Sequence, residues 1–123
     1  MTLLGRWLTW VTVRGHSMSP TLHDRQRLLV RKLRRPPRRG DVVVFAVPDT
    51  GSDAGDPPYR VKRVAAVGGD PVPDWLAGTM PGVARVPAGH VVVAGDNRRS
   101  QDSRHLGLVA VDDIVGTAPT SAP

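Results

Sequence analysis

The sequence predicts a single all-β domain built mainly of antiparallel strands, and three observations support this. Valine is the dominant candidate for the core, and β-branched side chains fit a pleated sheet better than a helix. Twelve prolines and thirteen glycines divide the chain into short segments, which favours strands joined by turns. The 123 residues, 40% of them apolar, are enough for one hydrophobic core.

In the first half of the chain, apolar or alternating segments predict strands at 9–14, 27–33 and 42–47. The last of these is a continuous, mostly β-branched run, so we expect a buried central strand. The Ser-Pro-Thr sequence at 19–21 favours a turn or a short helical start. Residues 49–58 are rich in glycine, aspartate and proline and predict a flexible surface loop.

In the second half, residues 60–67 and 90–94 predict two further strands. Between them, the proline-rich segment 71–89 is poorly patterned and predicts a small excursion from the core, a second lobe. A polar loop follows at 98–107, and residues 108–114 return to apolar content. We expect three parts in all: an amino-terminal apolar segment or first strand (1–13), the main domain (14–116) and a disordered tail (117–123).

The amino-terminal segment 1–13 is apolar with one interrupting charge, Arg6. A membrane-spanning helix needs about 20 apolar residues, and a signal peptide carries its charge before the apolar run. The segment meets neither requirement. It is compatible with the end of a longer span, with an interfacial anchor carrying two tryptophans, and with a simple first strand.

The chain is basic, with a formal charge of +6, and it uses fifteen arginines but only two lysines, Lys32 and Lys62. A basic cluster at 31–39 is compatible with a solvated loop or with an anionic membrane surface. Binding of nucleic acid is not expected, because no aromatic side chains are interleaved with these charges. There is no cysteine, so disulfide and thiolate chemistry are excluded.

The four histidines lack the spacing of a metal site, so no metal is expected. A Ser-His-Asp triad would leave no trace in the sequence and stays open.

Lysine is a candidate general base in this chain. An amine with a usual pKa of about 10.4 becomes a base only when burial lowers that value. Lys62 lies in an apolar strand, whereas Lys32 lies in the basic cluster. The alternative to a catalytic role is that Lys62 is simply an exposed lysine at the edge of a strand.

Four motifs in order resemble those of the type I signal peptidase family, and the resemblance covers nearly the whole chain. The stretch 15–22 resembles the family's Gly-x-Ser-Met-x-Pro-Thr-Leu motif around its nucleophile. Residues 40–43 resemble its Gly-Asp-Val-Val segment, and 61–64 resemble its lysine motif. Residues 95–107 resemble its last motif, Gly-Asp-Asn-Arg followed by Ser-x-Asp-Ser-Arg and glycine. The match looks closest to the Gram-positive short form with a small second lobe.

The resemblance implies a role for each matched residue. Ser17 would attack the scissile carbonyl with Lys62 as general base, and the Ser17 amide would donate to the oxyanion. Ser100 would orient the lysine, and Asp102 and Arg104 would form a structural ion pair. Six residues would line shallow apolar pockets for alanine side chains of the substrate: Val11, Val13, Gly15, Met18, Leu22 and Val61.

The resemblance implies a serine endopeptidase that cleaves signal peptides from exported precursors at Ala-x-Ala sites. We expect a monomer without cofactor, at the cell membrane, with its catalytic domain outside the cytoplasm. One alternative is a soluble maturation protease of the same family with a dedicated precursor, such as those that trim nickel superoxide dismutase precursors. Another is a non-catalytic basic module that binds lipid or nucleic acid.

Overall fold

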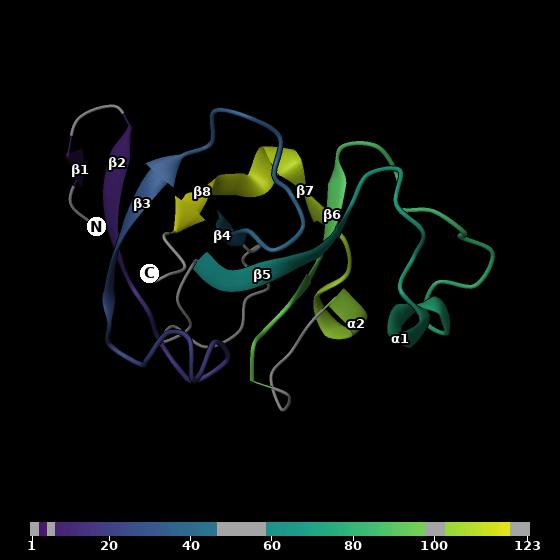
Figure 1. Ribbon diagram of the computed structural model, residues 1–123, viewed down its shortest axis with the longest axis horizontal. Helices are drawn as coiled ribbons and strands as arrows, with labels where there is room; N and C mark the ends of the chain where they lie inside the picture. The colour runs from purple at the N-terminus through teal and green to yellow at the C-terminus, as the bar shows by residue number, and fades with distance from the viewer. Residues whose placement is uncertain (1–2, 5–6, 47–58, 98–102, 119–123) are drawn as a thin grey trace, which may run out of the picture.

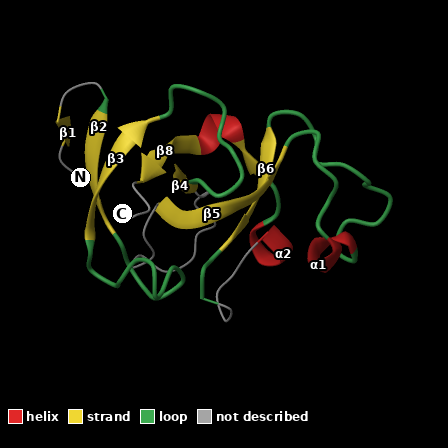
Figure 2. Ribbon diagram, in the orientation of Figure 1, coloured by secondary structure: helices red, strands yellow, loops and turns green. Residues whose placement is uncertain are grey.

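The computed structural model describes residues 3–4, 7–46, 59–97 and 103–118. Within these residues, eight strands form one sheet in the order β1-β2-β3-β8-β4-β5-β6-β7, and every neighbouring pair is antiparallel (Figure 1). Helices contribute little (Figure 2). The predicted all-β, mainly antiparallel fold is therefore confirmed. The elements are β1 (Leu3–Leu4), β2 (Leu8–Thr12), β3 (Arg27–Lys32), β4 (Val42–Ala46), β5 (Tyr59–Val67), α1 (Asp74–Ala77), β6 (His90–Ala94), α2 (Ser103–Leu106), β7 (Val109–Ala110), the 3-10 turn η1 (Val111–Asp113) and β8 (Ile114–Ala118).

The strands expected before residue 95 correspond to β2, β3, β4, β5 and β6, with ends that shift by at most two residues. The apolar segment 108–114 is not one element, because η1 separates β7 from β8. The tail also begins later than expected. Thr117 and Ala118 continue β8, where backbone pairing with β3 and β4 holds them in the sheet. The expected loop 49–58 and the rest of the tail lie outside the described residues.

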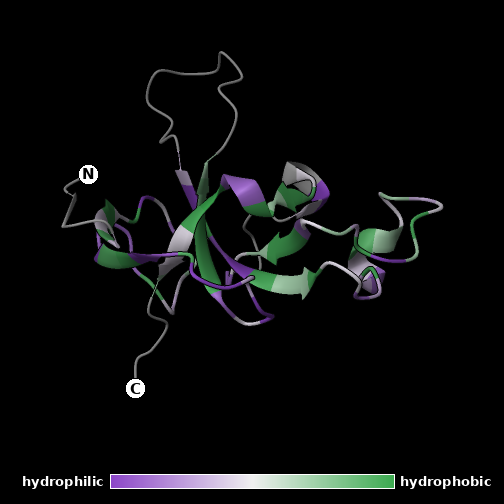
Figure 3. Cartoon of the chain, turned by 90° about the horizontal axis from the view of Figure 1, so that it is seen from above, coloured by the Kyte–Doolittle hydropathy of each residue, from purple (hydrophilic) through white to green (hydrophobic). Residues whose placement is uncertain are grey.

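The central strand β4 is buried on both faces, as its continuous apolar run predicts. Alternation sends Val42 and Val44 into one core cluster and Val43 and Phe45 into another. Seen from above, the central strands are mostly in the colour of hydrophobic residues (Figure 3). The sheet therefore has apolar packing on both sides. The strand β5 pairs directly with β4, the most buried strand of the sheet.

The excursion at 71–89 forms the small second lobe. Val72, Leu76 of α1 and Val86 pack on Ala66 of β5 and Val92 of β6 in a third apolar cluster. Figure 1 shows α1 at one end of the molecule, and β2 and β3 at the other. The lobe is thus a local extension of the sheet core rather than an independent unit.

Gly116 is a position where the fold has no room for a side chain. A Cβ built there would lie 2.2 Å from the carbonyl oxygen of Arg31 and 2.9 Å from Cγ1 of Val30. Both contacts belong to β3, so the strand backbone itself would have to move. We expect Gly116→Ala to lower the free energy of unfolding by about 3 kcal/mol, at the upper end of overpacking effects.

Chemical denaturation of the purified variant measures this effect. The matched control is Gly78→Ala, because a Cβ at Gly78 meets nothing within 4 Å and its φ of −66° suits any residue. The control is expected to leave stability unchanged or slightly raised. Equal stability of the two variants would contradict the close approach of β8 to β3.

Candidate active site

Ser17 lies in a turn-rich loop that connects β2 to β3. Gly15 makes the chain change direction with a φ of +88°, a conformation that favours glycine. Its N–H donates to the carboxylate of Asp24 at 2.7 Å, and this hydrogen bond lowers the pKa of Asp24. Ser17 itself is half-buried, and the next side chain, Met18, is only 1% exposed. The loop is thus fixed on both sides of the serine.

Lys62 lies in β5 and is buried, with 3% of its surface exposed. Alternation along β5 places it on the same face as Val64, which is also buried. Across the sheet its register partner is Val43. Lys32, by contrast, is exposed on β3. Of the two lysines, Lys62 therefore has the apolar surroundings that its sequence neighbours predict.

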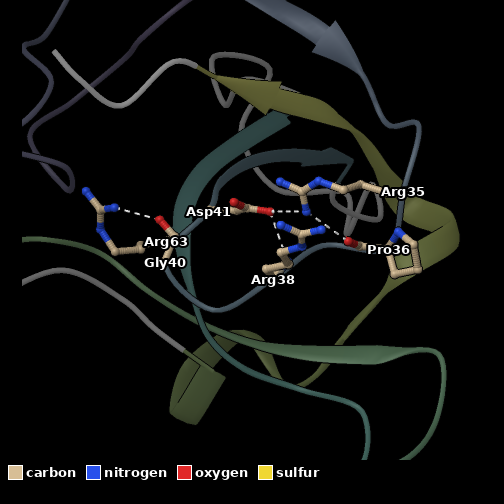
Figure 4. A network of polar contacts seen from close by, with 6 residues as sticks. All are labelled: Arg35, Pro36, Arg38, Gly40, Asp41 and Arg63. Atoms are coloured by element: carbon tan, nitrogen blue, oxygen red, sulfur yellow. Dashed lines mark hydrogen bonds and ion pairs between the residues drawn. The ribbon is translucent and has the colours of Figure 1, made fainter. Parts of the chain in front are cut away.

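Arg63, the residue after Lys62, connects two of the motifs. Its Nη1 donates to the carbonyl oxygen of Gly40 at 2.7 Å (Figure 4). Its Nε and Nη2 donate to the two carboxylate oxygens of Asp96 at 2.9 and 2.8 Å. This bidentate contact lowers the pKa of Asp96, aided by the hydroxyl of Thr21, and it raises the pKa of Arg63. The Gly-Asp segment and the Gly-Asp-Asn turn are thereby held to β5.

The Gly-Asp segment is itself ordered by its aspartate. Asp41 accepts hydrogen bonds from the backbone N–H of Arg38 at 2.9 Å and from Nη1 of Arg35 at 3.3 Å (Figure 4). These contacts close the turn that precedes β4. The backbone of Asp41 also accepts from the N–H of Val64 at 2.8 Å, which ties the turn to β5 a second time.

The Gly-Asp-Asn turn at 95–97 also holds the loop that carries Ser17. The N–H of Asn97 donates to the carbonyl oxygen of Ser17 at 2.8 Å, and its side-chain amide donates to that of His16 at 3.0 Å. The Thr21 hydroxyl donates to Asp96 at 2.5 Å, which adds a second link. Backbone and side chain thus fasten residues 16–21 to the turn at 96–97.

The end of β6 brings this assembly to the edge of β5 near Lys62. The β5–β6 pairing begins at Arg63 with Ala94, so the chain leaves β6 next to Arg63 and enters the turn at 95–97. Neighbouring side chains in a strand point to opposite faces, so Arg63 anchors the turn while Lys62 enters the buried side. Segments from all four motifs therefore meet around the middle of β5, at Arg63.

The other predicted site residues are placed less completely. Ser100 and Asp102 lie outside the described residues, and so does any pair between Asp102 and Arg104. Arg104 is exposed, with its guanidinium carbon 5.8 Å from the ring centroid of Trp75. Ser103 was not singled out from the sequence, yet it is buried and accepts a hydrogen bond from the N–H of Val93 at 2.9 Å.

Most residues predicted to bind substrate belong to the core. Val11, Val13, Met18 and Leu22 are buried in one apolar cluster that also contains Val42 and Val44. Val61 is half-buried and packs against that cluster, and Gly15 is exposed. Core packing explains the four buried side chains, and of the five apolar side chains Val61 has the most accessible surface.

The contacts of Arg63, Asp96 and Asn97 had no assigned role in the sequence analysis. All three belong to the quoted motifs, and this membership was the only indication of their importance. The bidentate contact joins residues 33 positions apart, and a separation of that kind leaves no local pattern.

Comparison with known proteins decides the family. A family model described as signal peptidase, peptidase S26, matches residues 1–75 and 73–121, which is nearly the whole chain. The chain belongs to this signal peptidase family. The resemblance seen in its four motifs is thereby confirmed, and membership implies a peptidase.

Individual signal peptidases match over most of the chain. Signal peptidase I of Bacillus caldolyticus is 32% identical over 133 residues, covering 85% of this chain and 73% of the relative. Signal peptidase IB of Staphylococcus aureus is 30% identical over 155 residues, with coverages of 93% and 78%. Signal peptidase I of Leptolyngbya laminosa is 33% identical over 129 residues, but only 63% of its length is matched.

Two features are absent from the described part of this signal peptidase family member. Among its described helices, none has the length and apolar character needed to cross a bilayer. In the same part of the chain, no three or more metal-ligating side chains gather into a group that could hold a metal ion.

The contact between Arg63 and Asp96 predicts a pH-dependent contribution to stability. The folded-state pKa of Asp96 is lowered, so the contribution is complete above the unfolded value of about 3.9 and is lost as pH falls through the folded value. Asp96→Asn is expected to lower the free energy of unfolding by about 1–2 kcal/mol at pH 7. The difference from wild type should narrow below about pH 4.

Denaturation at a series of pH values measures this difference. The control is Asp112→Asn, since Asp112 is exposed on η1 and has no ion pair among the described residues. If the difference in the free energy of unfolding between wild type and Asp96→Asn stays constant down to pH 2, the ionisation of Asp96 is not linked to stability.

Proposed function

We propose that this chain is a serine endopeptidase that removes signal peptides from exported precursors after small residues. Ser17 acts as the nucleophile and Lys62 as the general base. The observation that carries the proposal is the burial of Lys62, 3% exposed, next to Arg63 near the middle of β5, to which the Ser17 loop is fastened. Arg63 and the turn at 96–97 make that connection.

Burial explains why a lysine can serve as base here. An apolar environment disfavours the ammonium form, and a neutral amine has the lone pair needed to accept a proton. Arginine does not deprotonate in proteins, so none of the fifteen arginines can replace it. His16 is exposed, so its imidazole lacks the buried surroundings of the Lys62 amine.

The reaction then proceeds in two balanced steps. The Lys62 amine takes the proton of the Ser17 hydroxyl as the oxygen attacks the scissile carbonyl, and the Ser17 N–H donates to the developing oxyanion. The C–N bond breaks as the ammonium returns the proton to the leaving amine. Water, deprotonated by the same amine, then attacks the acyl-enzyme. The ester C–O bond to Ser17 breaks, the ammonium returns the proton to the Ser17 oxygen, and the signal peptide leaves with its new carboxylate.

The edge of β5 offers a place for the substrate backbone. Among the described residues, no strand pairs with β5 on the β6 side before Arg63, so residues 59–62 border the site there. An extended precursor segment fits such an edge by adding a strand. Val61, half-buried beside the apolar cluster, would face the small side chains of the substrate.

The remaining motif residues have supporting roles in this proposal. Ser100 would hold the Lys62 amine in position through its hydroxyl, and Asp102 with Arg104 would stabilise the loop that carries it. These assignments rest on the match to the family's last motif.

A cleavage assay with matched precursors tests the proposed function. The purified chain is incubated with a precursor carrying an Ala-x-Ala site and with the same precursor in which the last alanine is replaced by tryptophan. We expect cleavage after the second alanine, at least about a hundredfold faster than for the tryptophan form, because apolar pockets discriminate strongly against excess volume. Equal cleavage of both, or of neither, would contradict the proposal.

A further inference from the structure

A tryptophan of the small lobe lies next to an arginine of the last motif. The guanidinium carbon of Arg104 on α2 is 5.8 Å from the ring centroid of Trp75 on α1, which is within the range of a cation–π contact. Trp75 is 41% exposed, so its ring stands outside the apolar cluster of the lobe. Figure 1 shows the two short helices near each other. The contact therefore joins the small lobe to the Ser-x-Asp-Ser-Arg motif.

The small lobe holds Trp75 at a defined place on the sheet. Backbone hydrogen bonds of 2.8 to 3.0 Å join residues 69–72 to residues 84–86, the two segments that connect the lobe to β5 and β6. Leu76, the neighbour of Trp75 on α1, is fully buried in the apolar cluster that packs on these two strands. The ring of Trp75 is thus carried by a helix that is itself anchored in the core.

The helix α2 is tied to the strands that carry the candidate site. The hydroxyl oxygen of Ser103 accepts a hydrogen bond from the N–H of Val93 in β6 at 2.9 Å. Val93 is the register partner of Val64 in β5. Val64 lies two residues after Lys62 on the same face of that strand. The helix is therefore attached directly across from the part of β5 that carries the proposed base.

We propose that Trp75 is a positioning residue: its contact with Arg104 keeps α2, and with it the last motif, in place beside Lys62. The tryptophan does not touch the reacting atoms. The inference rests on the proposed function, in which this motif holds the Lys62 amine. An exposed cation–π contact is modest in strength, so it adjusts the position of α2 and does not determine whether the domain folds. Small misplacements of catalytic groups lower the rate.

Hydrogen exchange measures the hold on α2 without any cleavage. The N–H of Gly107 donates to the carbonyl oxygen of Ser103 at 2.9 Å at the end of α2, so its exchange rate reports opening of the helix. We expect Trp75→Leu to speed this exchange about two- to fivefold. Trp75→Phe keeps an aromatic face and should restore the protection. Exchange of the Leu22 N–H, which donates to Met18 in the loop that carries Ser17, should not change.

Kinetics on a short Ala-x-Ala peptide test the consequence for catalysis. Trp75→Leu should lower kcat about two- to fivefold with KM unchanged, and Trp75→Phe should recover the rate. Arg104→Gln should lower kcat less in the Trp75→Leu background than in wild type, because the two side chains act through one contact. Trp7→Leu is the matched control and should keep the wild-type kcat. Trp7 is 47% exposed and has the guanidinium carbon of Arg34 at 4.6 Å, at the opposite end of the molecule (Figure 1).

The exchange and rate measurements can each overturn the inference. Unchanged exchange at Gly107 in Trp75→Leu does so, and so does a loss of rate that phenylalanine does not restore or that Trp7→Leu shares. Independent effects of Trp75→Leu and Arg104→Gln on kcat also overturn it. If wild type cleaves no precursor, the proposed function is wrong, and the exchange rates still decide whether Trp75 holds α2. Unchanged thermal unfolding of each variant shows that the fold is intact.

Discussion

Lys62→Met is expected to lower kcat/KM for the Ala-x-Ala precursor by at least about a hundredfold, the usual size of a general-base contribution. Methionine is close to lysine in length and is apolar, so it fits the buried position on β5 beside Val43 and Val64. It cannot accept a proton from Ser17.

Lys32→Met is the matched control for this experiment. Lys32 is the other lysine of the chain, and it is exposed on β3. This variant should keep the wild-type kcat/KM on a peptide substrate. Cleavage that survives Lys62→Met at near the wild-type rate would eliminate the lysine mechanism.

The fold could be predicted from the sequence wherever burial leaves a simple pattern. Residues 42–47 read as an apolar run because β4 is covered on both faces, and β5 was recognisable from valines and alanines. The carboxyl-terminal region was harder. The turn η1 splits an apolar segment whose pairing with β6 on one side and with β3 and β4 on the other is decided by contacts distant in sequence.

For the candidate site, the sequence motifs nominated the residues but gave no sign of the contacts that connect them. The burial of Lys62 could be expected from its apolar neighbours, and the motif order pointed to Ser17. No local rule indicates that Arg63 joins the Gly-Asp-Asn turn at Asp96 to Gly40. Pairing of charged side chains over such separations depends on the register of the sheet. The same is true of Gly116, where a side chain is excluded only because β8 packs closely against β3.

Ser17→Ala is expected to lower kcat on the same precursor by at least about a thousandfold, because the acyl-enzyme can no longer form. The change removes one oxygen from a half-buried side chain. The contacts that hold the loop run through the Ser17 carbonyl and the Asn97 N–H, and these are untouched. The loop should keep its shape, so precursor binding should persist while turnover is lost.

This separation of binding from turnover distinguishes a nucleophile from a residue that only supports the loop. Ser19→Ala is the control, because Ser19 lies in the same loop and its backbone N–H, which the substitution keeps, donates to the carbonyl oxygen of His16 at 3.0 Å. It should retain kcat within a few-fold of wild type. Affinity for a precursor that cannot be cleaved, measured by calorimetry, should be similar for wild type, Ser17→Ala and Ser19→Ala. If Ser17→Ala weakens this affinity in proportion to the loss of rate, Ser17 is structural and another group must attack the carbonyl.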